Sequence, residues 1–195
     1  MLIGISAIVY ENGWAYAAIS SQWRGGDMAG VKLDAIDLRI LAEIQRDGRI
    51  TKLALAERVG LSATPCWTRL ARLEEAGIIA GYHARLNLRP FGPVATVLME
   101  VTLGSHRQSD FERFERAVRE TPEIVACWAV GGGIDYVLKI VTTDIDAYQR
   151  LVDGLLAREV GIDQYFTYIV TKAVKDEAPI PVELLAPALV RETER

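Results

Sequence analysis

The sequence predicts an α+β protein made of two domains with different architectures. Between residues 31 and 90, apolar residues recur three and four positions apart and stop at turn residues, which is typical of short helices. Between residues 91 and 175, β-branched runs and helical patterns follow the order β-α-β-β-α-β. We therefore predict an N-terminal winged helix-turn-helix joined to a C-terminal ferredoxin-like βαββαβ domain.

The first 30 residues fit neither pattern. Asn12-Gly13 is compatible with a strand pair around a tight turn, whereas the missing helical period favours a loose, disordered tail or a start codon assigned too far upstream. Because residues 1–30 lie outside both patterns, we treat them as an N-terminal extension. We expect residues 1–27 to be dispensable and translation to begin at Met28.

The next residues carry the start and stop signals of two helices. Apolar residues from Leu33 to Ile44 recur at helical spacing, and the run stops at Asp47-Gly48. Thr51 can cap the next helix, which continues to Val59 and is followed by a glycine turn. With one further helix, these segments can enclose a small core.

The stretch from Gly60 to Gly77, GLSATPCWTRLARLEEAG, predicts that third helix. Ser62 can cap it with its hydroxyl, and Gly77 can end it in the left-handed conformation. Its apolar stripe consists of Cys66, Leu70 and Leu73, which lie four and three residues apart. The polar residues of the stretch that we expect to contact DNA are Ser62, Thr64, Thr68, Arg69 and Arg72.

The helix-turn-helix layout is the reason to expect DNA binding. A short helix fits the major groove, and a guanidinium matches either a phosphate or the acceptor edge of guanine. An ordinary amphipathic surface helix would show the same stripe. Trp67 can contact the DNA backbone or cover the edge of the core, and its size and periodicity favour partial burial.

The charge distribution agrees with DNA binding by the first domain. Residues 31–90 contain 10 Lys and Arg against 7 Asp and Glu, a net charge of +3, whereas residues 91–195 contain 11 against 17, a net charge of -6. The whole chain has a net charge of -4, which argues against a protein that coats nucleic acid indiscriminately. The basic part coincides with the predicted helix-turn-helix.

A change of pattern marks the second domain. The stretch IIAGYHARLNL after Gly77 predicts a short β-ribbon or wing, and the prolines and glycines between Arg89 and Pro93 mark a boundary. Strands are predicted over residues 94–103, 124–130, 136–142 and 165–174, and helices over residues 109–119 and 145–157. Both helices should cover one sheet face, so the open apolar face predicts self-association. Residues 176–195 form a proline-containing tail with one short helix around residues 182–185.

Composition narrows the class of protein further. Half of the 195 residues are hydrophobic, but no run of about 18 apolar residues occurs and the first residues lack a basic stretch, so we expect a cytoplasmic protein. Cys66 and Cys127 are too few for a disulfide scaffold, and His83 and His106 lack neighbours at metal-ligand spacing. We predict no cofactor, no metal site and no catalytic residues, hence no enzyme.

The quoted residues resemble the leucine-responsive regulatory protein and AsnC (Lrp/AsnC) family over residues 33–175. The resemblance lies in LDAIDLRIL, DGRIT, VGLSATPCWTRLARLEEAGII, GGGIDYVLK and TYIVTK. It implies a ligand-responsive transcription regulator that binds double-stranded DNA, forms dimers that often assemble into octamers, and responds to an amino acid or a related small molecule. The run TPCWTRLARLEEAGIIAGYHA is also similar to regulators found beside ectoine breakdown.

The same resemblance implies an effector site at Gly132, Gly133, Asp135 and Tyr136, near the place where different dimers meet. Many family members have an acidic residue where this chain has Gly133. A phosphate loop is not favoured, because the glycines lack the required Gly-Lys-Ser/Thr ending. Asp135 can pair with a ligand ammonium group or simply accept from nearby backbone donors. An architectural DNA-wrapping protein without an effector is the alternative function.

Overall fold

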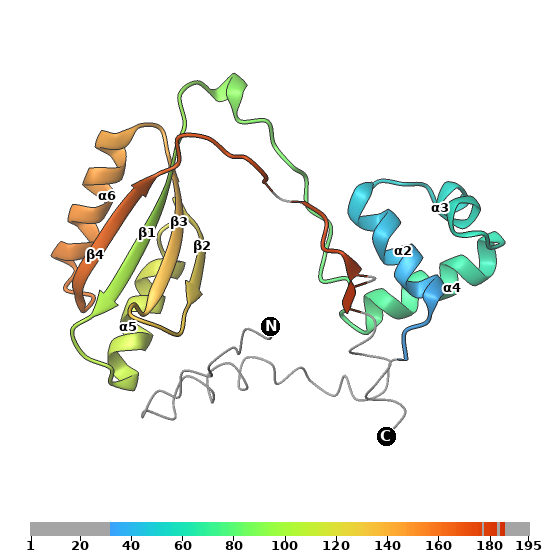
Figure 1. Ribbon diagram of the computed structural model, residues 1–195, viewed down its shortest axis with the longest axis horizontal. Coiled ribbons are helices and arrows are strands. Elements are labelled where there is room, and N and C mark those ends of the chain that lie inside the picture. The colour runs from blue at the N-terminus through green and yellow to red at the C-terminus, as the bar shows by residue number, and fades with distance from the viewer. Residues whose placement is uncertain (1–31, 177, 183, 186–195) are drawn as a thin grey trace, which may run out of the picture. The chain divides into compact units, whose positions relative to one another are not determined.

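The computed structural model describes residues 32–176, 178–182 and 184–185, so the expectations for residues 1–30 lie outside the described residues. The chain divides into two compact units (Figure 1). One, the helical unit, contains the described residues up to Arg85 and those from Lys175 onward, and the other, the sheet unit, contains Leu86–Val174. The first boundary lies before the expected residues 90 and 91. The described part of the tail belongs to the helical unit, although we expected it to be separate.

The helical unit contains three helices, α2 (Ala35–Arg46), α3 (Lys52–Val59) and α4 (Ala63–Glu75). Asp34 and Asp37 form a capping box at the start of α2. The hydroxyl of Thr51 accepts a hydrogen bond from the Ala54 N–H at 3.2 Å, which confirms the predicted cap of α3. Gly60 then turns the chain in the left-handed conformation, at φ 73°.

The cap predicted for α4 is only partly observed. Ser62 does occupy the N-cap position, but its hydroxyl makes no capping hydrogen bond, so that prediction was wrong. The residue is exposed, and water can satisfy the hydroxyl there. At the other end, Gly77 has φ 69° and its N–H donates to the Glu74 carbonyl, as a left-handed terminator should.

The core of the helical unit lies between these three helices. Ile40 of α2, Leu55 and Val59 of α3, and Cys66 and Leu73 of α4 are all almost fully buried. Cys66 and Leu73 lie on the stripe read from the sequence, which explains why α4 packs by this side. Val182, far along the chain, also packs against this cluster.

The segment after α4 forms no β-ribbon. Residues 78–88 contain no strand, and only a short 3-10 helix follows, η1 (Arg89–Phe91). The β-prone composition therefore misled the prediction, because no neighbouring strand in the described chain pairs with these residues. The Tyr82 hydroxyl instead donates to the Glu74 carboxylate at 2.7 Å, so the segment is held by a side-chain contact to α4.

The sheet unit has the predicted order of elements. These are β1 (Ala95–Leu103), α5 (Gln108–Arg119), β2 (Ile124–Ala129), β3 (Tyr136–Thr142), α6 (Ile145–Ala157) and β4 (Ile162–Ile169). The strands form an antiparallel sheet in the order β2-β3-β1-β4, which confirms the ferredoxin-like topology. The last strand lies earlier than expected and ends at Ile169, just before a final backbone hydrogen bond from the Val170 N–H to the Thr96 carbonyl.

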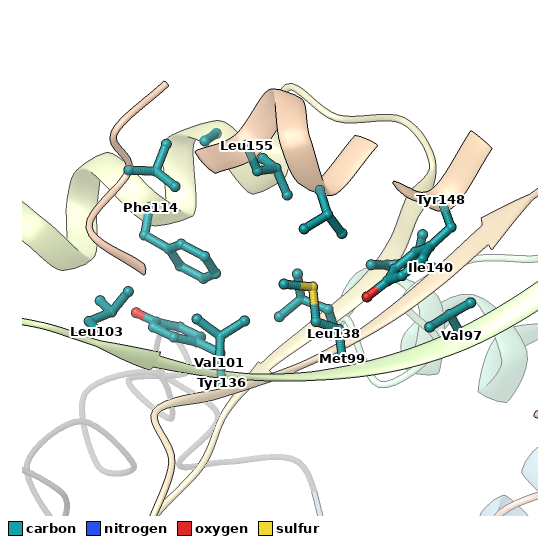
Figure 2. Packing of buried hydrophobic residues seen from close by; sticks show 13 residues of the cluster. Val97, Met99, Val101, Leu103, Phe114, Tyr136, Leu138, Ile140, Tyr148 and Leu155 are labelled. Atoms are coloured by element: carbon teal, nitrogen blue, oxygen red, sulfur yellow. The ribbon is translucent and has the colours of Figure 1, made fainter. Parts of the chain in front are cut away.

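Alternate residues of the strands decide which face is covered. Val97, Met99 and Val101 of β1 point toward the helices, and Phe114 of α5 and Leu155 of α6 meet them from the other side (Figure 2). Figure 2 also shows Tyr136, Leu138 and Ile140 of β3 in the same layer.

Within the sheet unit, residues 86–174, no helix lies on the opposite face of the sheet, which remains partly apolar. Leu98, Trp128, Phe166 and Tyr168 are between 36% and 51% exposed, which is unusual for side chains of this size. Among the described residues, no helix has both the length and the apolar character needed to cross a membrane.

Candidate functional site

Helix α4 presents a polar surface away from the core of the helical unit. Ser62, Thr64 and Thr68 are exposed, while Cys66, Leu70 and Leu73 are buried behind them. Thr64, Pro65 and Thr68 line a groove of about 440 Å³ together with the two arginines of this helix. The hydroxyl of Thr68 donates to the Thr64 carbonyl at 3.1 Å, so it is held close to the helix.

The two arginines do not project freely from this surface. The Arg69 guanidinium lies 2.6 Å from the Asp34 carboxylate and 2.9 Å from the Asp37 carboxylate. The Arg72 guanidinium lies 2.5 Å from the second carboxylate oxygen of Asp37. The Asp37 side chain is fully buried, whereas those of Arg69 and Arg72 are 29% and 45% exposed. Hydrogen bonds from Arg69 to Asp34 and Asp37 raise the pKa of its guanidinium.

These ion pairs fix α4 against the first turn of α2. The sequence interpretation placed Arg69 and Arg72 on the DNA side and did not assign them acidic partners. One signal was available, since Asp37 occupies a position of the apolar stripe between Ile36 and Ile40. A buried carboxylate on such a stripe requires a cationic partner. Arg72 still borders the groove, and its remaining donors can reach a ligand there.

Trp67 lies beside the groove residues on α4 and is 42% exposed. The Lys52 ammonium group lies 2.9 Å from the centre of the Trp67 ring, in a cation-π contact between the first turn of α3 and α4. Partial burial against the core was predicted for Trp67, and that prediction was wrong: the side chain is exposed and is not among the described residues packed on the core of the helical unit, and its ring contacts a cation from the neighbouring helix instead.

The glycine loop between β2 and β3 is open and exposed. Gly131, Gly132 and Gly133 are exposed, and a side chain at any of them would meet no atom within 4 Å. Gly132 has φ 149°, which other residues rarely adopt. The Val130 N–H donates to the Asp135 carbonyl at 2.9 Å and closes the loop.

The Asp135 carboxylate lies at the end of this loop with two partners. It accepts from the Leu103 N–H at 2.7 Å and lies 3.0 Å from Nε2 of His106. Its side chain is 17% exposed, and that of His106 is 64% exposed. The backbone role that we left open for Asp135 is thus present, and the histidine was not identified as its partner from the sequence.

Tyr136 points away from the loop into the core of the sheet unit (Figure 2). Its ring is 4.6 Å from that of Phe114, and its hydroxyl donates to the Glu115 carboxylate at 3.1 Å. Burial, followed by the negative charge of Glu115, raises the pKa of this hydroxyl. The structure therefore places the largely buried Asp135 carboxylate at the end of the glycine loop and Tyr136 in the core of the sheet unit.

Two family models match this chain, and together they span both units. The model described as winged helix-turn-helix DNA-binding matches residues 33–80, and the model described as Lrp/AsnC ligand binding domain matches residues 96–180. The first range contains α4 with its groove, and the second contains the glycine loop with Asp135.

Curated relatives and solved structures agree with these models. The chain is 52% identical to the transcriptional regulatory protein DoeX of Halomonas elongata, over 80% of this chain and 99% of that protein. It is 43% identical to the leucine-responsive regulatory protein of Escherichia coli strain K12, over 75% and 89% respectively.

Two solved structures resemble the fold closely. The transcriptional regulator NMB0573 of Neisseria meningitidis, solved as a complex with L-Met, is 33% identical with a TM-score of 0.74, over 79% of this chain and 99% of that one. An AsnC family transcriptional regulator from Agrobacterium tumefaciens is 31% identical with a TM-score of 0.74, over 78% and 99%.

Proposed function

Because this chain belongs to the Lrp/AsnC family of transcriptional regulators, we propose that an amino acid or amino-acid derivative binds its sheet unit and changes its DNA affinity or assembly. The chain is a DNA-binding regulator with a ligand-binding domain, and its family consists of regulators rather than enzymes. The observation that carries the proposal is that α4, the predicted DNA-reading helix (hereafter the reading helix), is held by ion pairs to the buried Asp37 carboxylate, in a chain whose other unit presents an open glycine loop beside a carboxylate.

We assign the DNA contacts of α4 to two groups. Ser62 is exposed at the start of the helix, and Thr64 and Thr68 are exposed and line the groove, so these hydroxyls can contact phosphates or base edges. One guanidinium nitrogen of Arg72 pairs with Asp37, and the side chain borders the groove. Its remaining N–H donors can therefore bind DNA while the contact with Asp37 is kept. Arg69 is less exposed and bridges two carboxylates, so its contribution is chiefly to hold α4 in place.

Fluorescence anisotropy on the region upstream of the protein's own gene, across salt concentrations, tests this assignment. Thr64→Val keeps the side-chain shape and should cost about 1 to 3 kcal/mol if the hydroxyl contacts a base edge. Arg72→Ala should weaken binding and, if it contacts a phosphate, reduce the salt slope by about 1. Arg46→Ala is the matched control, because Arg46 is 64% exposed and, among the residues that the structure describes, pairs with Glu43 of its own helix alone. Equal effects of Arg72→Ala and Arg46→Ala would refute the role of Arg72.

We propose that the effector ammonium group pairs with Asp135 above the glycine loop. A carboxylate offers about four acceptor positions, and the Leu103 N–H and His106 occupy two of those on Asp135. Gly132 and Gly133 carry no side chains that would shield the site, so a ligand can approach the backbone. Tyr136 supports the loop from the core through Phe114 and Glu115.

The variant Asp135→Asn removes the charge but keeps an acceptor for the Leu103 N–H. Calorimetry with L-methionine, followed by a panel of amino acids, should show binding to the natural protein and a loss of at least tenfold in this variant, since hydrogen bonds to charged groups contribute about 1.5 to 3 kcal/mol. Asp153→Asn on α6 is the control for a charge change elsewhere in the sheet unit. Unchanged affinity in Asp135→Asn would place the pocket elsewhere. A protein that binds DNA identically with and without every ligand would favour the architectural alternative.

Self-association through the open sheet face would connect effector binding with DNA binding. Phe166 and Tyr168 are about half exposed on the sheet face that the helices of the sheet unit leave open, and we propose dimers through this face and octamers built from them. Phe166→Asp should lower the mass measured by sedimentation, whereas Ile145→Asp, at a 42% exposed position on the helical face, should not. A ligand that prefers one assembly must shift the population toward it and thereby re-space the reading helices on DNA.

The similarity of the run TPCWTRLARLEEAGIIAGYHA to regulators found beside ectoine breakdown further leads us to propose a link to ectoine catabolism. Ectoine belongs in the ligand panel for this reason. An effect of ectoine or of an amino acid on DNA affinity would identify the class of effector directly, because ligand and DNA affinities are thermodynamically coupled.

A further inference from the structure

After the sheet unit is complete, the chain returns to the helical unit and forms hydrogen bonds there with the side chain of one glutamine. Gln45 lies in the last turn of α2, and its side-chain N–H donates to the Ile180 carbonyl at 3.1 Å. The Ile180 N–H donates back to the Gln45 side-chain oxygen at 2.8 Å. One side chain therefore satisfies both backbone groups of Ile180, as a neighbouring strand would.

Further contacts lie on either side of this pair. Val182 packs against the apolar core of the helical unit, and the Leu184 N–H donates to the Pro181 carbonyl at 2.9 Å in a helical turn. Before it, Arg85 lies 3.8 Å from the Asp176 carboxylate and also donates to the Asp176 carbonyl at 3.4 Å. Polar and apolar contacts together thus place the described part of the tail on the helical unit, residues 175–176, 178–182 and 184–185.

We propose that residues 178–182, 184 and 185 form a strap that ties the DNA-binding unit to the sheet unit at a second point. The chain passes between the units at Arg85–Leu86 and again at Val174–Lys175. The first crossing alone would leave the helical unit on a single linker. The strap anchors the chain after the second crossing to α2 through Gln45 and Ile180, so a change in that chain can act on α2. This role rests on the proposed effector-responsive regulation.

Helix α2 connects the strap with the reading helix. Gln45 lies at its C-terminal end, while Asp34 and Asp37 at its N-terminal end bind the arginines of α4. A helix of 12 residues is about 18 Å long and behaves as a rod on this scale. A displacement of Ile180 therefore shifts α2 and with it the Asp34 and Asp37 side chains that bind α4. A second tether also restricts the motion of the DNA-binding unit before it binds, so the unit loses less conformational entropy when it binds DNA.

Val182→Asp and Val174→Asp in the full chain form a matched test of the strap. Val182 is partly buried against the core, whereas Val174 is 90% exposed. Hydrogen exchange of the Ile180 amide should be slower than that of an unprotected amide in the natural protein and in Val174→Asp. It should accelerate about 2- to 10-fold in Val182→Asp, and also in Gln45→Ala, which removes the acceptor. Equal exchange in all four proteins would overturn the anchoring.

The second measurement is affinity for the upstream DNA, with and without L-methionine. Val182→Asp should bind DNA roughly 2- to 10-fold more weakly and respond less to the ligand, whereas Val174→Asp should match the natural protein. Faster exchange with unchanged DNA affinity and ligand response would overturn the coupling. Failure of the natural protein to bind DNA at all would refute the proposed function, and the exchange data would still decide whether the strap is anchored.

Discussion

Removing the charge of Asp37 is the most informative perturbation of the helical unit. Its carboxylate is fully buried and accepts from Arg69 at 2.9 Å, from Arg72 at 2.5 Å and from the Asp34 N–H at 3.0 Å. The variant Asp37→Asn keeps the volume and one acceptor oxygen. It also replaces the other oxygen with an NH₂ group that must face a guanidinium, so at least one contact becomes unfavourable.

The expected cost follows from how deeply each partner is buried. Breaking a buried ion pair by removing one partner costs about 3 to 5 kcal/mol, because the other charge stays desolvated. Here the Arg69 and Arg72 side chains are 29% and 45% exposed, so water can hydrate them again and the cost should fall to about 2 kcal/mol. For a unit of this size, that lowers the melting temperature by about 8 to 16 °C.

The matched control is Asp34→Asn at the N-cap of the same helix. Its side chain is 51% exposed, and asparagine caps a helix as well as aspartate does, so only the exposed pairing with Arg69 is lost, at about 0 to 1 kcal/mol. Hydrogen exchange of the α2 and α4 amides in the full chain reports the local free energy of unfolding for both variants. Equal destabilisation by the two variants would show that burial of Asp37 does not govern the attachment of α4.

Three further predictions concern single groups. Thr51→Ala should destabilise the helical unit by about 1 kcal/mol in urea unfolding, because the Ala54 N–H loses its cap, and Thr51→Ser should not. The hydrogen bond from the Ala147 N–H lowers the pKa of Asp144 below 3.8, so this cap stabilises the folded state above pH 3.8 and its contribution is lost as pH falls through the folded pKa. Hydrogen exchange of the Ala147 amide, measured as a function of pH, should show this loss, and Asp144→Asn should abolish the pH dependence. Burial and Glu74 raise the pKa of Tyr82 from 10 to about 12, so its contact with α4 should be fully present below pH 10 and be lost as pH rises through about 12. Ultraviolet titration should show this late ionisation, and Tyr82→Phe should lack it.

Much of the fold could be predicted because it depends on neighbours in the chain. The Thr51 cap joins residues three positions apart, and Gly60 and Gly77 adopt the left-handed conformation that few other residues tolerate. The stripe of Cys66, Leu70 and Leu73 determines which side of α4 is buried. The β-prone segment after Gly77 shows the limit of such signals, since a strand also needs a partner at its edge.

The sequence by itself determined the two architectures, the reading helix, the glycine loop and the family, because these depend on periodicity, capping and local motifs. Only the tertiary structure decided what the site residues contact. Arg72 meets Asp37 across 35 positions, His106 meets Asp135 across 29, and Gln45 meets Ile180 across 135. Such pairs form when folding closes long loops, and no local pattern records which charge or amide will lie opposite. The reading helix was therefore visible in the sequence, and its attachment to α2 was visible only in the fold.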